Sequence, residues 1–174
     1  MLPMLRVVIA RQWLHLAIGT ALTVAAGAAS AEDGLQPRAD EARWYFQTSV
    51  YTKHYHEDPR HNNHQHLLNL ERWNAEGNGF GIAFFDNSFN QPSQYVYGGK
   101  FWRPLDSAPL FHFKLTAGLI NGYKGEYQNK IPYNGHGIAP AILPAVGFSG
   151  ERFATEAVLF WNVGAMITVG IYLN

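Results

Sequence analysis

The residues with the clearest potential for chemistry are Asp86, Asn87 and Ser88, which directly follow the apolar run that ends at Phe85. An acid, an amide and a hydroxyl in consecutive positions could supply a nucleophile and the groups that support it. The same residue types also end strands, because their side chains bond the backbone in turns. The stretch therefore predicts a site only if the rest of the chain places a base beside it.

The segments around this stretch have the alternating pattern of β-strands. From Trp44 onward, runs of about eight to twelve residues carry apolar side chains at every second position and are separated by turn residues. None of the runs has a helical period, and a long loop over 118–137 begins where the fifth run ends. We predict strands at 44–54, 66–73, 79–85, 93–102, 111–119, 138–148, 152–161 and 163–173.

The character of the two faces favours a membrane barrel. In the fifth run Phe111 and Phe113 alternate with His112 and Lys114, so one face is bulky and apolar and the other is polar. The alternative is a soluble sandwich or lipocalin-type barrel, in which the bulky apolar side chains would fill the interior and the polar side chains would face solvent. Connections that alternate between short and long also fit an outer-membrane barrel. We predict an all-β fold, an eight-stranded antiparallel outer-membrane β-barrel over 44–174.

The N-terminus predicts export. Two arginines precede an apolar run over 14–29, and a small-residue cleavage pattern ends at Ala31. The run has about 16 residues, fewer than the roughly 20 that a spanning helix needs. We therefore predict a cleaved signal peptide over 1–31 in preference to an anchor helix. Residues 32–43 are polar and are predicted to form a lead-in, either a short helix or a disordered segment.

Composition narrows the classes of function. Thirteen Lys and Arg balance thirteen Asp and Glu, so the chain has no net field that would gather nucleic acid. It has no cysteine, which removes disulfides, thiolate catalysis and cysteine-ligated metals. Five histidines lie between positions 54 and 66 and raise the question of a metal, but no regular element fixes their spacing. We interpret most of them as solvated loop residues and predict no metal and no cofactor.

Strand direction supplies the base. In an antiparallel barrel the first and third strands run the same way, so His54 lies at the same rim as Asp86, Asn87 and Ser88. A histidine beside a serine is the minimum set for taking an acyl group from an ester, since the imidazole removes the hydroxyl proton and returns it to the leaving alcohol. Asp86 or Asn87 could orient the imidazole or polarise the carbonyl. The esters at such a rim would be lipids of the outer leaflet.

Several short blocks follow one another along the chain: TKH at 52–54, GN at 77–78, AFFDNSFN at 83–90, FWRPL at 101–105, TAG at 116–118, IAPAILP at 138–144 and VGF at 146–148. In these blocks and in their order the chain resembles the outer-membrane lipid A palmitoyltransferases (PagP). The resemblance implies a barrel enzyme with an interior pocket for one acyl chain, which moves palmitate from the sn-1 position of a phospholipid to lipid A. It also implies that the family's essential histidine and serine correspond to His54 and Ser88.

Several positions depart from the family's pattern. The family has aspartate directly before the serine, where this chain has Asn87, and Asp86 comes one residue earlier, where a strand would point it to the other face. The family's N-terminal amphipathic helix is shortened or missing, the last hairpin loop around Asn162 is brief, and the chain ends in Asn174 instead of an aromatic residue. The segment 95–99, where the family sets the pocket floor, is altered, so no acyl chain length is predicted.

Two prolines interrupt the strand predicted at 138–148. Pro140 and Pro144 cannot complete a β-ladder, so they could open a lateral gap for lipid entry or mark an irregular edge. The alternatives to acyl transfer are an outer-membrane lipid esterase or deacylase, which delivers the acyl group to water, and a non-catalytic barrel. We expect a monomer whose partners are a phospholipid donor, lipid A and the outer membrane.

Overall fold

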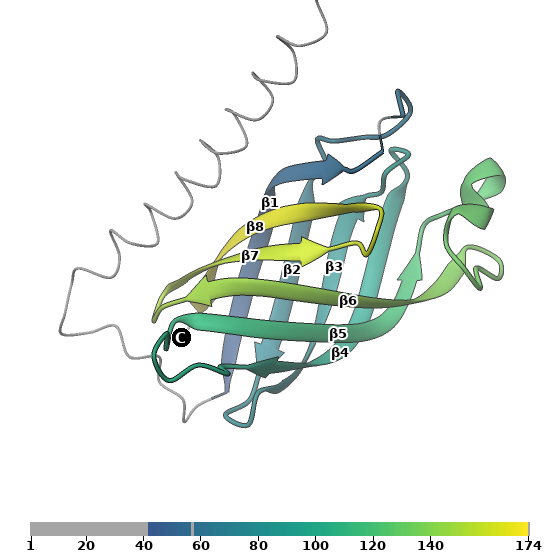
Figure 1. Cartoon of the computed structure of the whole chain (residues 1–174). Coiled ribbons are helices and arrows are strands. Elements are labelled where there is room, and N and C mark those ends of the chain that lie inside the picture. The colour runs from purple at the N-terminus through teal and green to yellow at the C-terminus, as the bar shows by residue number, and fades with distance from the viewer. Residues whose placement is uncertain (1–41, 57, 174) are drawn as a thin grey trace, which may run out of the picture. The chain divides into compact units, whose positions relative to one another are not determined.

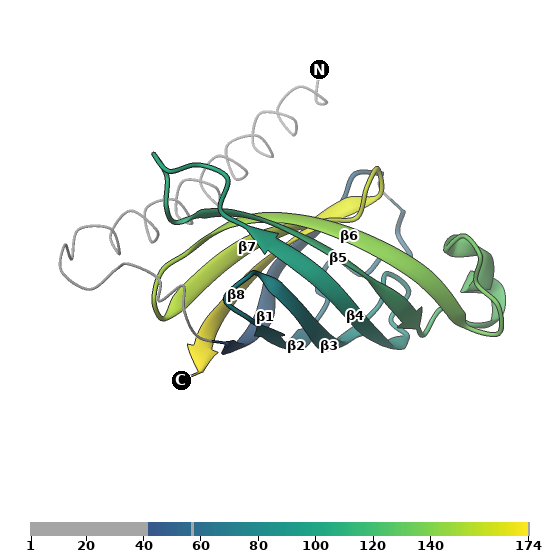
Figure 2. The same ribbon diagram turned by 90° about the horizontal axis from the view of Figure 1, so that it is seen from below.

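The computed structural model describes residues 42–56 and 58–173, which form a closed antiparallel barrel (Figures 1 and 2). Each strand pairs with its neighbours in sequence, and the first strand closes on the last. The predicted signal peptide and nearly all of the lead-in lie outside the described residues. The elements are β1 (Arg43–His54), β2 (Leu67–Trp73), β3 (Asn78–Asp86), β4 (Pro92–Trp102), β5 (Phe111–Asn121), the 3-10 helix η1 (Gly125–Lys130), β6 (Ile138–Ser149), β7 (Phe153–Leu159) and β8 (Gly164–Leu173).

The predicted eight-stranded β-barrel is confirmed, with strand ends within a few residues of those expected. The largest difference is at the loop over 118–137. There β5 continues to Asn121, because that residue still pairs with Ile138 of β6, and η1 forms inside the remaining loop. This loop extends beyond the barrel at the right-hand end in Figure 1. Across the described part of the chain, no helix has the length and apolar character needed to cross a membrane.

Alternation gives the barrel an apolar outside. On β3, Phe80 and Phe84 face outward and are 57% and 48% exposed, whereas Ala83 is buried inside. Gly81 also faces inward, and a Cβ there would lie 2.5 Å from the hydroxyl of Tyr97. The small interior face of β3 thus makes room for a large ring from β4, as a narrow barrel requires.

The end of the interior far from the β3–β4 turn is filled by a buried charge network. Lys114 Nζ lies 2.9 Å from Glu71 Oε1 and 2.5 Å from Glu156 Oε2. His112 Nε2 lies 3.1 Å from Glu156 Oε1, so the polar face that the sequence predicted for this strand is turned inward. Buried charges are tolerable only when they are paired in this way. We call Glu71, His112, Lys114 and Glu156 the interior charge network.

A β-bulge in β1 decides which way His54 points. The pairing of β1 with β8 shifts register between Ser49 and Tyr51, so Val50 is an extra residue. Before the bulge the odd-numbered Tyr45 is buried, and after it the even-numbered His54 is buried. Without the bulge, His54 would share the outward face that the sequence assigns to Phe46. The alternation read from the sequence could not reveal this inversion.

Two ladders are broken near the same rim. β1 pairs with β2 only over 43–48, and β6 pairs with β7 only over 145–149. In both ladders the missing pairs are those nearest the rim where β1 ends. Pro140 and Pro144 lie in the part of β6 that pairs with β5 but not with β7, which fits both predicted alternatives, a lateral gap and an irregular edge. The indole Nε1 of Trp161 donates to the carbonyl of Ile142 at 2.7 Å and bridges this second break.

Candidate active site

The structure brings the predicted base and nucleophile together. His54 Nε2 lies 2.7 Å from Ser88 Oγ, although the two residues are 34 positions apart in the chain. His54 ends β1 and Ser88 follows β3, so both lie at the rim where these strands finish. The imidazole is buried and 2% exposed. The predicted meeting of His54 and Ser88 at one rim is confirmed.

The third member of the site is Asn63, which the sequence did not predict. Its Oδ1 lies 2.8 Å from His54 Nδ1 and also accepts the backbone N–H of His54 at 3.2 Å. A backbone N–H can only donate, so this atom of Asn63 is the oxygen. Nδ1 of a neutral His54 therefore carries the ring hydrogen, and Nε2 is left to accept the hydroxyl hydrogen of Ser88. This is the tautomer that a general base for Ser88 requires.

The loop before β2 holds these three residues in place. The N–H of Asn62 donates to the carbonyl of Ser88 at 2.8 Å, which fastens the loop to the β3–β4 turn. The ring of His61 packs against that of His54, with centroids 4.4 Å apart. The Asp58 carboxylate binds the Arg60 guanidinium, which holds the pKa of Asp58 well below its usual range. The loop is thus built around the imidazole, although its sequence has no periodic pattern.

Asn87 and Asp86 do not orient the imidazole as predicted, since His54 Nδ1 binds Asn63. Asn87 is fully buried and holds the turn instead, its Oδ1 accepting the N–H of Phe89 at 2.8 Å and that of Gln91 at 3.1 Å. This is the ordinary turn chemistry of asparagine. Asp86 pairs with Pro92 at the end of the β3–β4 ladder, and its carboxylate is half-buried. The turn therefore presents Ser88, and neither neighbouring residue is hydrogen-bonded to the His54 imidazole.

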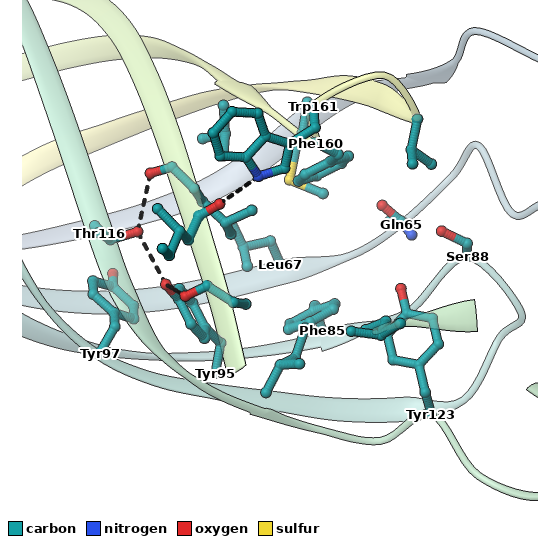
Figure 3. Close-up of a pocket in the computed structure, with 18 of the residues that line it drawn as sticks. Gln65, Leu67, Phe85, Ser88, Tyr95, Tyr97, Thr116, Tyr123, Phe160 and Trp161 are labelled. Carbon is teal, nitrogen blue, oxygen red and sulfur yellow. Dashed lines mark hydrogen bonds between the residues drawn. The ribbon is translucent and has the colours of Figure 1, made fainter. Parts of the chain in front are cut away.

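A cavity of about 670 Å³ opens beside Ser88 and runs into the barrel (Figure 3). This volume is typical of pockets for small ligands, which span about 300–1,000 Å³. Most of its wall is apolar or aromatic, and it reaches both broken ladders, through Gln65 and Leu67 on one side and Ile142 and Trp161 on the other. Such a cavity suits a long hydrocarbon chain, because each buried methylene contributes about 0.8 kcal/mol.

Two tyrosines of β4 line the inner part of the cavity, together with Glu71 and Lys114 of the interior charge network. The rings of Tyr95 and Tyr97 stack with centroids 4.5 Å apart (Figure 3). The Tyr95 hydroxyl donates to Thr116 Oγ1 at 3.2 Å, and the Tyr97 hydroxyl donates to Glu71 Oε1 at 2.6 Å. Tyr97 thereby connects the cavity to the interior charge network. These bonds fix the two rings as a floor, which we call the tyrosine floor.

The histidine-rich loop contains no evident metal site. Within 42–56 and 58–173, no group of three histidine, aspartate or glutamate side chains is arranged to hold a metal ion. His54 and His61 are in ring contact, while His64 and His66 are exposed.

Comparison with known proteins gives no identification. No protein-family model and no curated protein sequence matches this chain. The functional assignment therefore depends on the geometry described above and on the ordered blocks of sequence.

Proposed function

We propose that this protein is an outer-membrane acyltransferase, which moves an acyl chain from the sn-1 position of a glycerophospholipid to lipid A. The observation that carries the proposal is the 2.7 Å contact between His54 Nε2 and Ser88 Oγ at the mouth of a largely apolar cavity. A polar catalytic pair beside a cavity for a hydrocarbon chain is the arrangement that ester chemistry on a lipid requires.

The reaction follows from the hydrogen bonds of the site. His54 Nε2 takes the hydroxyl proton while Ser88 Oγ forms a bond to the ester carbonyl carbon. The bond from that carbon to the glycerol oxygen then breaks, and the leaving oxygen takes the proton from Nε2. In the second half, the acceptor hydroxyl gives its proton to His54 Nε2 as its oxygen bonds to the acyl carbon. The bond from that carbon to Ser88 Oγ then breaks, and Oγ takes the proton back from Nε2. Asn63 keeps the ring in one orientation and stabilises the imidazolium formed in each half.

The exterior supports a lipid environment for this chemistry. Large apolar side chains face outward on every strand, among them Phe46, Leu68, Phe84, Val96, Leu119, Ile142, Phe153 and Ile171. A polar interior with an apolar exterior is the pattern of outer-membrane barrels. The two broken ladders lie near the site, so a donor and an acceptor could each approach Ser88 laterally from the bilayer.

The test is to incubate the purified chain with phosphatidylcholine and lipid A in detergent and to analyse the products by mass. We expect lysophospholipid together with lipid A that is heavier by one acyl chain. Both products should be lost in His54→Ala and Ser88→Ala. Free fatty acid without acylated lipid A would instead identify a lipid esterase, and full activity in both variants would remove this site assignment.

His64→Ala is the matched control for His54→Ala. His64 lies in the same loop and is exposed. Its backbone N–H donates to Asn62 Oδ1, and this hydrogen bond does not involve the side chain. The variant should therefore retain wild-type activity.

A further inference from the structure

Acyl transfer from Ser88 needs a group that stabilises the carbonyl oxygen. When Oγ bonds to the carbonyl carbon, the carbonyl oxygen becomes an anion, and a hydrogen-bond donor placed beside it lowers the barrier. His54 cannot be this donor, because Nδ1 is bonded to Asn63 and Nε2 is occupied with the proton of Ser88. The donor must therefore come from another residue at the mouth of the cavity.

The hydroxyl of Tyr123 lies in the required place. Tyr123 follows β5, lines the cavity and directs its hydroxyl toward Ser88 (Figure 3). Ser88 lines the same cavity, so the two hydroxyl groups face a common space. The carbonyl oxygen is attached to the carbon that Oγ attacks, so a donor directed toward Ser88 lies on the side where the oxyanion forms.

Several contacts fix Tyr123 in this position. Its ring meets the edge of Phe89, with centroids 6.3 Å apart and planes at 83°. Its carbonyl accepts the side-chain amide of Asn134 at 2.8 Å. Gly122, just before it, has φ +140 and donates its N–H to the carbonyl of Gly137. The backbone that carries Tyr123 is thus held on both sides, which leaves the hydroxyl rotor as its free degree of freedom.

Tyr123 also has the right protonation state. Burial raises the pKa of the Tyr123 phenol above its ordinary value, and the nearby polar groups of Ser88 act in the opposite direction. The phenol is therefore protonated at neutral pH and able to donate.

We propose that Tyr123 is a catalytic residue that donates its hydroxyl hydrogen to the oxyanion formed at the acyl carbonyl. The proposal rests on the acyl-transfer function proposed above. In the resting site the Tyr123 hydroxyl is directed toward Ser88, whose own hydroxyl hydrogen goes to His54 Nε2. Once Oγ has bonded to carbon, the phenol turns to the oxygen that carries the new charge. No proton leaves Tyr123 during this step.

The test compares Tyr123→Phe with wild type on two phospholipids. One is an ordinary phosphatidylcholine, and in the other the sn-1 carbonyl oxygen is replaced by sulfur, which accepts hydrogen bonds poorly. For the ordinary lipid, we expect kcat for lysophospholipid release to fall by about 10²-fold, with KM within about twofold of wild type. The preference for the oxygen ester over the sulfur ester should fall by a similar factor.

Tyr127→Phe is the matched control, because it removes the same atom from a neighbouring ring that stacks on Phe89 with centroids 4.1 Å apart. It should keep wild-type kcat and wild-type preference. If Tyr123→Phe slows both lipids equally, or slows neither, the proposed donor role is wrong. If wild type releases no lysophospholipid at all, the proposed function itself fails, which is a separate result from either of these.

Discussion

The barrel interior contains two buried histidines whose surroundings differ. His54 lies between Asn63 and Ser88, and Ser88 lines the cavity. His112 lies between Glu156 and the ring of Phe101, whose centroid is 4.6 Å from that of the imidazole. The His54 imidazole is hydrogen-bonded to a neutral amide oxygen and to a hydroxyl, whereas the His112 imidazole belongs to the interior charge network. The comparison teaches that the hydrogen-bond partners of a buried histidine distinguish an imidazole placed to act on a neighbouring hydroxyl from one placed to stabilise buried charges.

The sharpest contrast is the same substitution at both histidines. His54→Ala should lower lysophospholipid release by about 10³-fold or more, because Ser88 loses its base. His112→Ala should leave that rate within about tenfold and lower the free energy of unfolding by about 1–3 kcal/mol, because Glu156 loses a buried donor. Rates and urea unfolding in micelles measure both. A catalytic loss in His112→Ala as large as that in His54→Ala would abolish the distinction.

Lys114→Met tests whether the interior charge network that contains His112 stabilises the fold. The substitution leaves Glu71 and Glu156 buried without their shared cation, so unfolding should become easier by about 3–5 kcal/mol. Lys100→Met is the control, because that ammonium is exposed and binds the Glu76 carbonyl and Asn78 Oδ1. Its cost should stay below about 1 kcal/mol. Equal urea midpoints for the two variants would show that the interior charge network does not stabilise the barrel.

Two alanine variants compare Asn63, which is hydrogen-bonded to His54 in the structure, with Asn87, which the sequence predicted as a residue that could orient the imidazole. Loss of Asn63 should lower kcat by about 10- to 100-fold, because the His54 ring loses the bond that fixes its tautomer. Loss of Asn87 removes the acceptor for two backbone N–H groups, so it should lower stability by about 1–2 kcal/mol. Kinetics at a temperature where both variants are folded distinguishes them. A greater loss of kcat in Asn87→Ala would restore the original assignment.

The smallest expected effect concerns the tyrosine floor. Tyr95→Ala should deepen the cavity and shift the acyl chains that are transferred toward longer ones, with selectivity changing by about fourfold for each additional methylene buried. Mass analysis of acylated lipid A formed from mixed donors measures the shift. An unchanged chain distribution would show that Tyr95 does not end the acyl site.

The contrast between the two histidines also marks how far the sequence can predict this protein. The alternation of Phe111 and Phe113 with His112 and Lys114 identified the strand, its faces and the interior position of His112, because a regular strand fixes the direction of each side chain. The same rule would have turned His54 outward, and only the bulge at Val50 brings it inside. The prediction that His54 meets Ser88 succeeded because strand direction alone places both at one rim.

Asn63 could not be predicted for a related reason. It lies in a loop without periodicity, and its role depends on the folded path that returns the loop to His54. Asn87 was the more visible candidate, because it stands next to Ser88 in the sequence, yet turn geometry sends its side chain into the backbone. Adjacency in the chain is thus a poor guide to adjacency at a turn.

The most direct measurement is covalent labelling of the purified barrel with a fluorophosphonate that carries a long alkyl chain. An activated serine displaces fluoride and forms a bond from its oxygen to phosphorus, which peptide mass analysis locates. The account predicts one adduct, on Ser88, which is lost in His54→Ala and retained in His112→Ala. Labelling of Ser88 that does not depend on His54, or no labelling at all, would contradict the role given to this pair.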